Sequence, residues 1–242
     1  MSQLHLHIEP GELAPFVLLP GDPGRARTIA ETFLDDARLT TDNRGLLGYS
    51  GRYRGVPISV QTTGMGCPSL AIVVEELVRL GARTLVRVGT AGIVADHVAP
   101  GDRIVADAAV PHDGTTRMYL GGDPYAPSAD FETTRALVDA AQAEPPAHVG
   151  LIHTEDAFYA RRPEEVPALA ARGVLGVEME AAALFLLGRL RGVRTGCMLV
   201  ASNHIGDPAF VAPEVLADGV AAMVRATLEA CVALHEGAEA AS

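Results

Sequence analysis

The segment Gly176-Val177-Glu178-Met179-Glu180-Ala181-Ala182-Ala183 is the one around which the rest of the chain is organised. Residues 174–177 are apolar enough for a buried strand, and residues 181–190 form an apolar helical pattern without a breaking residue. Burying a carboxylate is costly unless it is hydrogen-bonded or paired, so Glu178 and Glu180 need partners. A polyol would supply them, because carboxylate oxygens accept from hydroxyl groups. Alternatively, the two acids only open the helix, where its dipole favours negative charge.

Apolar strands and helices alternate on both sides of this segment. Strands are predicted at 16–20, 47–50, 56–61, 84–88, 103–110, 149–153 and 195–202, and helices at 26–33, 69–80, 133–143, 163–172 and 213–235. Glycine turns are expected after the strands that end at residues 20 and 88, a loop over residues 111–130, and a frayed tail over residues 236–242. Apolar strands separated by helices indicate an α/β fold whose sheet is covered on both faces.

Length and composition favour one domain over the whole of residues 1–242, because no stretch between the predicted elements resembles a linker. The apolar fraction of 48% is enough for a substantial core. A net charge of -11 and a pI near 5.1 argue against nucleic-acid binding, which needs a basic face. A small anion can still be held by a few arginines in a cleft.

The cysteines and the N-terminal segment bear on the compartment. Cys67, Cys197 and Cys231 are too few and too widely spaced for a disulfide framework or a zinc motif, and we expect Cys67 and Cys197 to be buried as small hydrophobic residues. Residues 1–11 lack the apolar core of a signal peptide, and no apolar run is long enough to span a membrane. We therefore expect a soluble cytoplasmic protein that does not bind membranes.

Glycines, arginines, acids, aromatic residues and an amide follow the predicted strands. In sheets of this kind, ligands bind beyond the carboxyl ends of the strands. The residues at those ends are Gly21 with Arg25, residues 63–66, Arg87 with Gly89 and Thr90, residues 156–159, residues 178–180, and Ser202 with Asn203. The sequence therefore predicts a ligand site at this edge of the sheet.

Arg87 is the strongest single signal for the kind of ligand. The turns at Gly21 and Gly89 match neither the P-loop nor the dinucleotide fingerprint, and each alone is typical of an ordinary strand-to-helix turn. Arg87, however, lies inside an apolar strand, where an arginine is rarely tolerated without an anion. Together with Arg25, Thr90 and nearby backbone amides it would form a site of phosphate size. We expect Arg87 to serve this site and not a structural ion pair.

Several motifs occur in an order and at a spacing that resemble the purine nucleoside phosphorylase and uridine phosphorylase family. They are Leu-Pro-Gly-Asp-Pro-Gly-Arg at 19–25, Arg-Gly-Leu-Leu-Gly at 44–48, Gly-Met-Gly at 64–66, Arg-Val-Gly-Thr-Ala-Gly at 87–92, Asp-Ala-Phe-Tyr at 156–159 and Gly-Val-Glu-Met-Glu-Ala at 176–181. The chain looks nearest to the short hexameric bacterial purine nucleoside phosphorylases. The resemblance covers about residues 4–205 and implies a single-domain, three-layer α/β fold with a mixed, largely buried central sheet flanked by helices.

The resemblance also implies a role for each motif residue. Phosphate would be bound by Gly21, Arg25, Arg44, Arg87 and Thr90; ribose by His5, Met179 and Glu180; and the base by Phe158, Val177, Glu178, Ser202 and Asn203. Arg87 and Asn203 would be the catalytic residues. His5 and Arg44 would reach in from a neighbouring subunit of a homo-oligomer, a hexamer built as a trimer of dimers. The alternative for His5 is a frayed terminal histidine.

The implied reaction is reversible phosphorolysis, in which a purine nucleoside and phosphate give the free base and ribose or deoxyribose 1-phosphate. Phosphate is a co-substrate, and we expect no metal and no organic cofactor. The glycosidic bond would break towards an oxocarbenium-like sugar, with phosphate as nucleophile and counter-charge. The site then needs hydrogen bonds that strengthen as the base becomes an anion.

One departure from the family pattern concerns the base. The resembling enzymes usually carry aspartate at the position of Asn203 and an arginine about a dozen residues later, but residues 204–223 contain no arginine. A carboxamide can donate to O6 and accept from a protonated N7, which predicts a preference for the 6-oxopurine nucleosides inosine and guanosine over adenosine.

Two other functions stay open. A nucleosidase of the same superfamily shares the Met-Glu motif but uses water, and it would not need Arg25, Arg44 and Arg87. A non-catalytic nucleoside-binding protein is suggested only by the missing aspartate. Phosphate dependence of base release separates the first from a phosphorylase, and tight inosine binding without turnover would favour the second.

Overall fold

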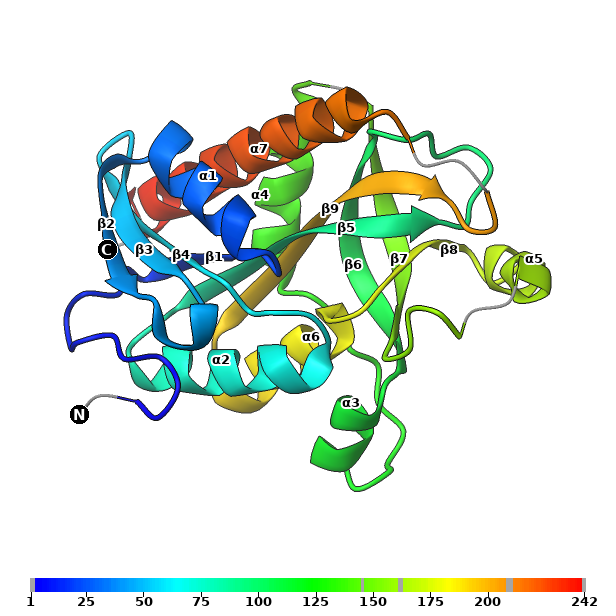
Figure 1. Cartoon of the computed structure of the whole chain (residues 1–242), viewed down its shortest axis with the longest axis horizontal. Coiled ribbons are helices and arrows are strands. Elements are labelled where there is room, and N and C mark those ends of the chain that lie inside the picture. The colour runs from blue at the N-terminus through cyan, green and yellow to red at the C-terminus, as the bar shows by residue number, and fades with distance from the viewer. Residues whose placement is uncertain (1–2, 145, 161–162, 208–210, 241–242) are drawn as a thin grey trace.

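The computed structural model describes residues 3–144, 146–160, 163–207 and 211–240, which form one nine-stranded sheet with helices on both faces (Figure 1). The strands are β1 (Phe16–Leu19), β2 (Asp35–Thr41), β3 (Gly48–Tyr53), β4 (Val56–Gln61), β5 (Thr84–Ile93), β6 (Arg103–His112), β7 (Ala147–Glu155), β8 (Val174–Glu178) and β9 (Arg194–His204). The helices are α1 (Pro23–Phe33), α2 (Cys67–Arg79), α3 (Gly114–Tyr119), α4 (Phe131–Gln142), α5 (Val166–Ala170), α6 (Ala181–Arg191) and α7 (Pro213–Ala240). Two short 3-10 turns lie at Asn43–Gly45 and Pro163–Glu165.

The sheet is mixed, and half of it closes on itself. Its strand order is β2-β3-β4-β1-β5-β8-β7-β6-β9, and β9 also pairs with β5, so that β5, β8, β7, β6 and β9 form a ring. The longest uninterrupted pairing in the ring is the parallel one of β5 with β9, from Thr84 opposite Arg194 to Ala91 opposite Ala201. The ring explains why these strands lack an edge, and it brings the ends of β5, β8 and β9 together.

Two buried clusters lie on opposite faces of the sheet. One contains side chains of α2 and α6, such as Leu70 and Phe185, and the other contains side chains of α1, α4 and α7, such as Ile29 and Leu228. The same division is visible in Figure 1, where α2 and α6 lie on one side of the strands and α1, α4 and α7 on the other. Neighbouring residues of a strand serve different clusters, as with Leu18 and Leu19 of β1. The predicted three-layer α/β fold is confirmed.

Three local predictions need correction. Residues 111–130 contain a helix, α3, which begins where the Asp113 side chain accepts from the Thr116 amide at 2.7 Å. The predicted turn at Gly89 is part of β5, because β9 continues to pair with β5 beyond that point. Helix α7 runs to Ala240 with exposed side chains over residues 236–240, where a frayed tail was expected; residues 241–242 lie outside the described part of the chain.

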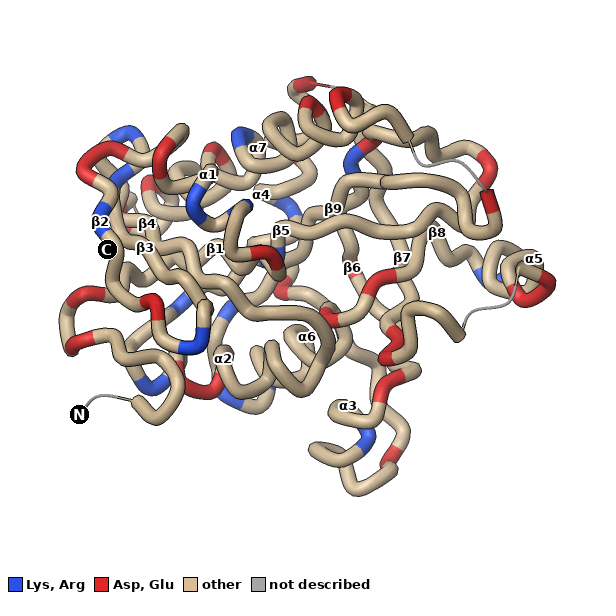
Figure 2. Tube along the Cα trace, in the orientation of Figure 1, with Lys and Arg blue, Asp and Glu red and all other residues tan. Residues whose placement is uncertain are grey.

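Charged residues, cysteines and apolar helices are distributed as follows. Basic and acidic positions are interspersed along the chain trace, without a continuous basic stretch in the described residues (Figure 2). All three cysteines are free and buried. No described helix combines the length and the apolar character that crossing a membrane requires.

Candidate active site

The ends of β1, β5, β8 and β9 meet around a cavity of about 640 Å³. Eleven of the thirteen residues that the sequence singles out line it: Gly21, Arg25, Arg87, Thr90, Phe158, Val177, Glu178, Met179, Glu180, Ser202 and Asn203. His5 and Arg44 do not line it. Residues that are up to 182 positions apart in the sequence therefore share one cavity. The carboxyl ends of β1, β8 and β9 contribute to it as predicted, whereas Arg87 and Thr90 lie within β5.

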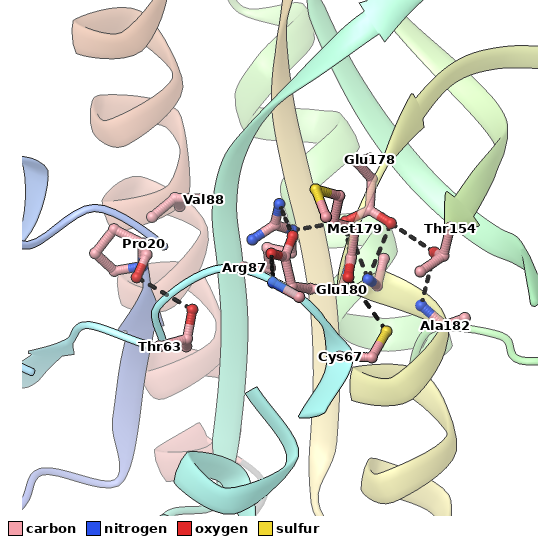
Figure 3. A network of polar contacts seen from close by, with 12 residues as sticks. Pro20, Thr63, Cys67, Arg87, Val88, Thr154, Glu178, Met179, Glu180 and Ala182 are labelled. Atoms are coloured by element: carbon pink, nitrogen blue, oxygen red, sulfur yellow. Dashed lines mark hydrogen bonds and ion pairs between the residues drawn. The ribbon is translucent and has the colours of Figure 1, made fainter. Parts of the chain in front are cut away.

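Glu178 is held by donors on every side (Figure 3). Arg87 Nε donates to its Oε2 at 2.8 Å and the Thr154 hydroxyl donates to its Oε1 at 2.5 Å. The backbone amides of Glu180 and Ala181 donate to the same carboxylate at 2.9 and 3.0 Å. Because Ala181 is the first residue of α6, Glu178 caps that helix. The helix-opening interpretation is therefore confirmed for Glu178, although its carboxylate also forms part of the cavity wall.

Glu180 shares the arginine with Glu178 and is buried to 3% exposure. Its Oε2 pairs with Arg87 Nη2, and its Oε1 accepts from the Gly66 amide at 2.5 Å. Gly66 adopts a φ of 85°, which a side chain would disfavour, so glycine is needed to aim this amide. Glu180 does not cap α6 with its side chain. Burial, with a further contribution from Glu178, raises the pKa of Glu180, and the opposing attraction of Arg87 does not cancel the rise.

Arg87 is buried, and its ion-pair partners, Glu178 and Glu180, belong to its own chain. Burial alone would lower its pKa, but Glu180 and Glu178 outweigh burial and raise it. A Cβ at residue 89 would lie 2.9 Å from the Arg87 guanidinium carbon, so Gly89 makes room for the side chain. The prediction that a buried arginine needs an anion is confirmed. The expectation that Arg87 avoids a structural ion pair is wrong, because both glutamates engage it.

Arg25 is the second cation of the cavity and is placed by α1. That helix begins at Asp22, whose carboxylate accepts from the amides of Gly24 and Arg25 at 3.1 and 3.0 Å. Arg25 Nη1 donates to the Val88 carbonyl at 3.3 Å, and Arg25 forms no ion pair within the described residues. Burial first, and then the nearby charge of Arg87, lower the pKa of Arg25. A cation so placed would gain from an anion in the cavity.

The far wall of the cavity carries the residues assigned to the base. The Ser202 hydroxyl donates to the Ala91 carbonyl at 3.0 Å, which ties the end of β9 to β5. Asn203 is half-buried and its Nδ2 donates to the His204 carbonyl at 3.2 Å. Phe158 is 66% exposed, with its ring centroid 5.0 Å from that of Tyr159. The carboxamide is thus fixed by the strand, whereas the aromatic side chain lies at the mouth.

His5 and Arg44 lie together, away from the cavity of their own chain. His5 Nδ1 is 2.7 Å from Glu76 Oε1, and Glu76 also accepts from the amides of His5 and Leu6, at 3.1 and 2.7 Å. Asn43 Nδ2 donates to the His5 carbonyl at 2.8 Å, and the adjacent Arg44 is exposed with a φ of 57°. The alternative of a frayed terminal histidine is wrong, because His5 is anchored.

Two relevant acids escaped the sequence analysis. Glu76 lies in the middle of the α2 pattern, and nothing in the sequence signals that it receives the N-terminal segment. Although burial acts to raise the pKa of Glu76, hydrogen bonds from Leu6 and His5 hold it below its usual value. Glu155 lines the cavity at the end of β7, one residue before the motif at 156–159. The rule that found the other strand ends would have found Glu155 if the predicted strand had been two residues longer.

Comparison with known proteins identifies the family of the chain. The family model described as the phosphorylase superfamily matches residues 15–234. A purine nucleoside phosphorylase DeoD-type of Roseobacter denitrificans is 38% identical over 95% of this chain and 99% of the relative, and one of an Exiguobacterium species is 43% identical over 84% and 86%. The crystal structure of a uridine phosphorylase from Vibrio fischeri superposes with a TM-score of 0.89 at 28% identity and covers 96% of both chains. The chain therefore belongs to the phosphorylase superfamily.

Proposed function

We propose that this chain is an enzyme that catalyses the reversible phosphorolysis of purine nucleosides. The observation that carries the proposal is the convergence of Arg25, Arg87, Glu180 and Asn203 on one cavity. Such a reaction needs cations for phosphate, a hydrogen-bond acceptor for the sugar hydroxyls and a polar group for the base. Arg25 with Arg87, Glu180 and Asn203 can supply these three elements. The relatives of 38% and 43% identity carry the name of this activity.

The arrangement suggests a division of labour within the cavity. Arg25, with Thr90 and the backbone at Gly21, would hold phosphate, and Arg87 would add charge while orienting Glu178 and Glu180. Glu180 would accept from ribose hydroxyls, beside Met179. Phosphate bound beneath the sugar would serve as nucleophile and would stabilise the positive charge that develops on it. Inorganic phosphate is then a co-substrate, and the reaction requires no organic cofactor.

The charge of the cavity supports sharing of the site between subunits. Among the described residues, its wall carries two arginines, Arg25 and Arg87, and four carboxylates: Asp22, Glu155, Glu178 and Glu180. This formal excess of two negative charges in the described part of the wall opposes binding of a phosphate dianion, and a further cation would favour it. Arg44 is exposed and away from its own cavity, and can supply that cation to a second copy of the chain. We extend the proposal to a homo-oligomer, a hexamer of three dimers, in which His5 and Arg44 complete the neighbouring site.

We further propose that the enzyme prefers 6-oxopurines because of Asn203. Its amide can donate to O6 and accept from protonated N7, whereas the exocyclic amine of adenosine would face a second donor. We expect inosine and guanosine to be cleaved roughly tenfold to a thousandfold more efficiently than adenosine, because a mismatched polar pair is costly but water can relieve part of it. Asn203→Asp should narrow this gap without closing it. Equal efficiency on adenosine and inosine would contradict this assignment.

The test of the activity is the release of base from inosine, guanosine, adenosine and uridine, measured side by side with and without phosphate. A phosphorylase gives phosphate-dependent release and ribose 1-phosphate. Release without phosphate would identify a nucleosidase, and nucleoside binding without release would identify a binding protein. Uridine serves as the control for the size of the base.

A further inference from the structure

Two histidines and a glutamate lie side by side where β6 and β7 end. The strands are parallel, and their register places His112 of β6 opposite Glu155 of β7, and Val110 opposite His153. Residues opposite each other in a sheet share a face, as do residues two apart on one strand. His112, His153 and Glu155 therefore project from one face of this strand pair.

The donor atoms of the three side chains are close enough for a shared ligand. One nitrogen from each imidazole and one oxygen of Glu155 all lie within 4.8 Å of one another. His153 Nε2 is 3.8 Å from Glu155 Oε2, and the ring centroids of His112 and His153 are 5.3 Å apart. Zinc takes nitrogen and oxygen donors at about 2.0–2.2 Å, so neighbouring donors in a tetrahedral site lie somewhat closer than 3.8 Å. Small side-chain rotations would bring these three donors into contact with one ion.

The burial of this cluster suits a metal site better than an exposed position would, because buried ligands are held in place. His153 is only 5% exposed and the Glu155 side chain 12% exposed, so two of the three ligands are held by the packing of the strands. His112 is exposed and also lines a second cavity of about 630 Å³, next to Asp113 and Arg117. An ion can therefore reach His112 from solvent, and Glu155 is open to the larger cavity.

We propose that His112, His153 and Glu155 form a binding site for a divalent transition-metal ion. Two imidazoles and one carboxylate favour Zn²⁺ over the hard cations Mg²⁺ and Ca²⁺, and they leave a coordination position for water. Binding would replace the present contacts of His153 and Glu155 with bonds to the metal. No sequence motif signals the site, because His112 and His153 are brought together only by the pairing of β6 with β7.

The site is independent of the proposed phosphorolysis, which needs no metal, but it adjoins the larger cavity. Glu155 lines that cavity, so a bound ion would become part of its wall. The ion would also fasten the end of β6, from which the chain continues into α3. A failure of the proposed enzymatic activity would leave the metal site untouched, and the converse also holds.

The chain contains a matched control in a second pair of histidines. The ring centroids of His97 and His148 are likewise 5.3 Å apart, and His148 Nε2 is 2.8 Å from Asp102 Oδ2. However, His97, His148 and Asp102 do not bring three donor atoms within 4.8 Å among the described residues. His97 and His112 are both exposed, so an alanine at either position should leave the fold intact.

The experiment uses untagged protein that has been treated with a chelator and exchanged into buffer without phosphate. Zn²⁺ is titrated by calorimetry, and Co²⁺ by its visible absorption. We expect one ion per chain with Co²⁺ bands of low-symmetry coordination. His112→Ala should weaken metal binding by about tenfold or more. Loss of a residue that only hydrogen-bonds to a metal ligand already lowers metal affinity by about that factor, and His112 would be a ligand itself. His97→Ala should bind as the wild type does.

Each outcome decides the proposal. Saturable binding that His112→Ala weakens and His97→Ala does not would support the site. Absence of saturable binding by the wild type at millimolar metal would overturn it. Equal affinity of His112→Ala and wild type would also overturn it, and melting temperatures of the metal-free variants would show that both remain folded.

Discussion

The junction of β8 with α6 and the N-terminal edge of the sheet both carry motif residues, but they use them differently. At the junction, Glu178, Glu180 and Arg87 satisfy one another within the chain and line its cavity. At the edge, Glu76 fixes His5, and Asn43 ties His5 to the segment of Arg44, yet neither His5 nor Arg44 reaches the cavity. A motif residue can therefore belong to the internal frame of a site, or be held in place for a site elsewhere.

The largest expected effect concerns the ion-paired residues at the junction of β8 with α6. Glu178→Ala should lower the free energy of unfolding by about 3–5 kcal/mol, because it leaves Arg87 with less compensation and strips the first amide of α6 of its acceptor. Chemical denaturation of both proteins measures this loss. Glu229→Ala removes the carboxylate of the exposed Arg54–Glu229 pair together with the acceptor of the Tyr53 hydroxyl, and it should cost only about 1–2 kcal/mol. Similar costs for the two variants would mean that the junction is no more than a surface-type contact.

The second prediction tests whether the N-terminal edge serves another chain. Arg44→Ala should leave stability unchanged and reduce turnover on the order of 10²-fold with a raised KM for phosphate, as expected for the loss of a preorganised charge. Arg25→Ala should likewise reduce turnover and raise the KM for phosphate, because Arg25 lies inside the cavity. Arg25 is preferable to Arg87 as the partner variant, because Arg87→Ala would leave two buried carboxylates unpaired.

Mixing the two variants provides the decisive readout. If the site is shared, subunit exchange between Arg44→Ala and Arg25→Ala creates some sites with both arginines intact, and activity partly returns. If exchange is demonstrated and activity stays at the level of the separate variants, Arg44 does not act across subunits.

The third prediction sharpens the role of Glu76. Glu76→Gln replaces one acceptor oxygen by a donor that faces the amides of His5 and Leu6, which should cost about 1–3 kcal/mol. Displacement of His5 should also reduce kcat/KM for nucleosides about ten- to hundredfold. The adjacent Glu75 pairs with Arg191 and Tyr119, so Glu75→Gln is a control that should leave nucleoside kinetics unchanged. Equal effects of the two variants on nucleoside kinetics would show that Glu76 does not act by positioning His5.

The junction was more predictable from sequence than the edge was, and the reason is physical. A buried strand that runs into a buried helix with acids between them is a local pattern, and the cost of burying Glu178 and Glu180 already requires partners. The identity of those partners was not predictable, since Arg87 reaches them only through the pairing of β5 with β8. Glu76 gave no signal at all, because a glutamate in an amphipathic helix is ordinarily solvated.

The fold shows the same limit. Apolar runs located each strand of the core, but the closure of β5, β8, β7, β6 and β9 into a ring depends on the double pairing of β9. The polar strand β2 escaped notice because most of its side chains are exposed and its sequence, Asp-Asp-Ala-Arg-Leu-Thr-Thr, lacks an apolar run. Long-range pairing, and not local propensity, forms both features.

The smallest expected effect compares the two buried glutamates by their response to pH. The pKa of Glu180 is raised, mainly by burial, so its protonated form stabilises the folded state: this stabilisation is present below the pKa of the unfolded chain and is lost as pH rises through the folded pKa. The pKa of Glu76 is lowered by the hydrogen bonds it accepts, so its contribution is present above the unfolded pKa and is lost as pH falls through the folded pKa.

Glutamine does not titrate at either position. The melting temperature of Glu180→Gln relative to wild type should therefore rise as pH increases from about 4 to 8, whereas that of Glu76→Gln should fall, with reference carboxyl values near 4.3 marking the lower limit. Melting curves of the three proteins across this range measure both slopes. Slopes of the same sign would show that the two carboxylates do not differ in the way their contacts imply.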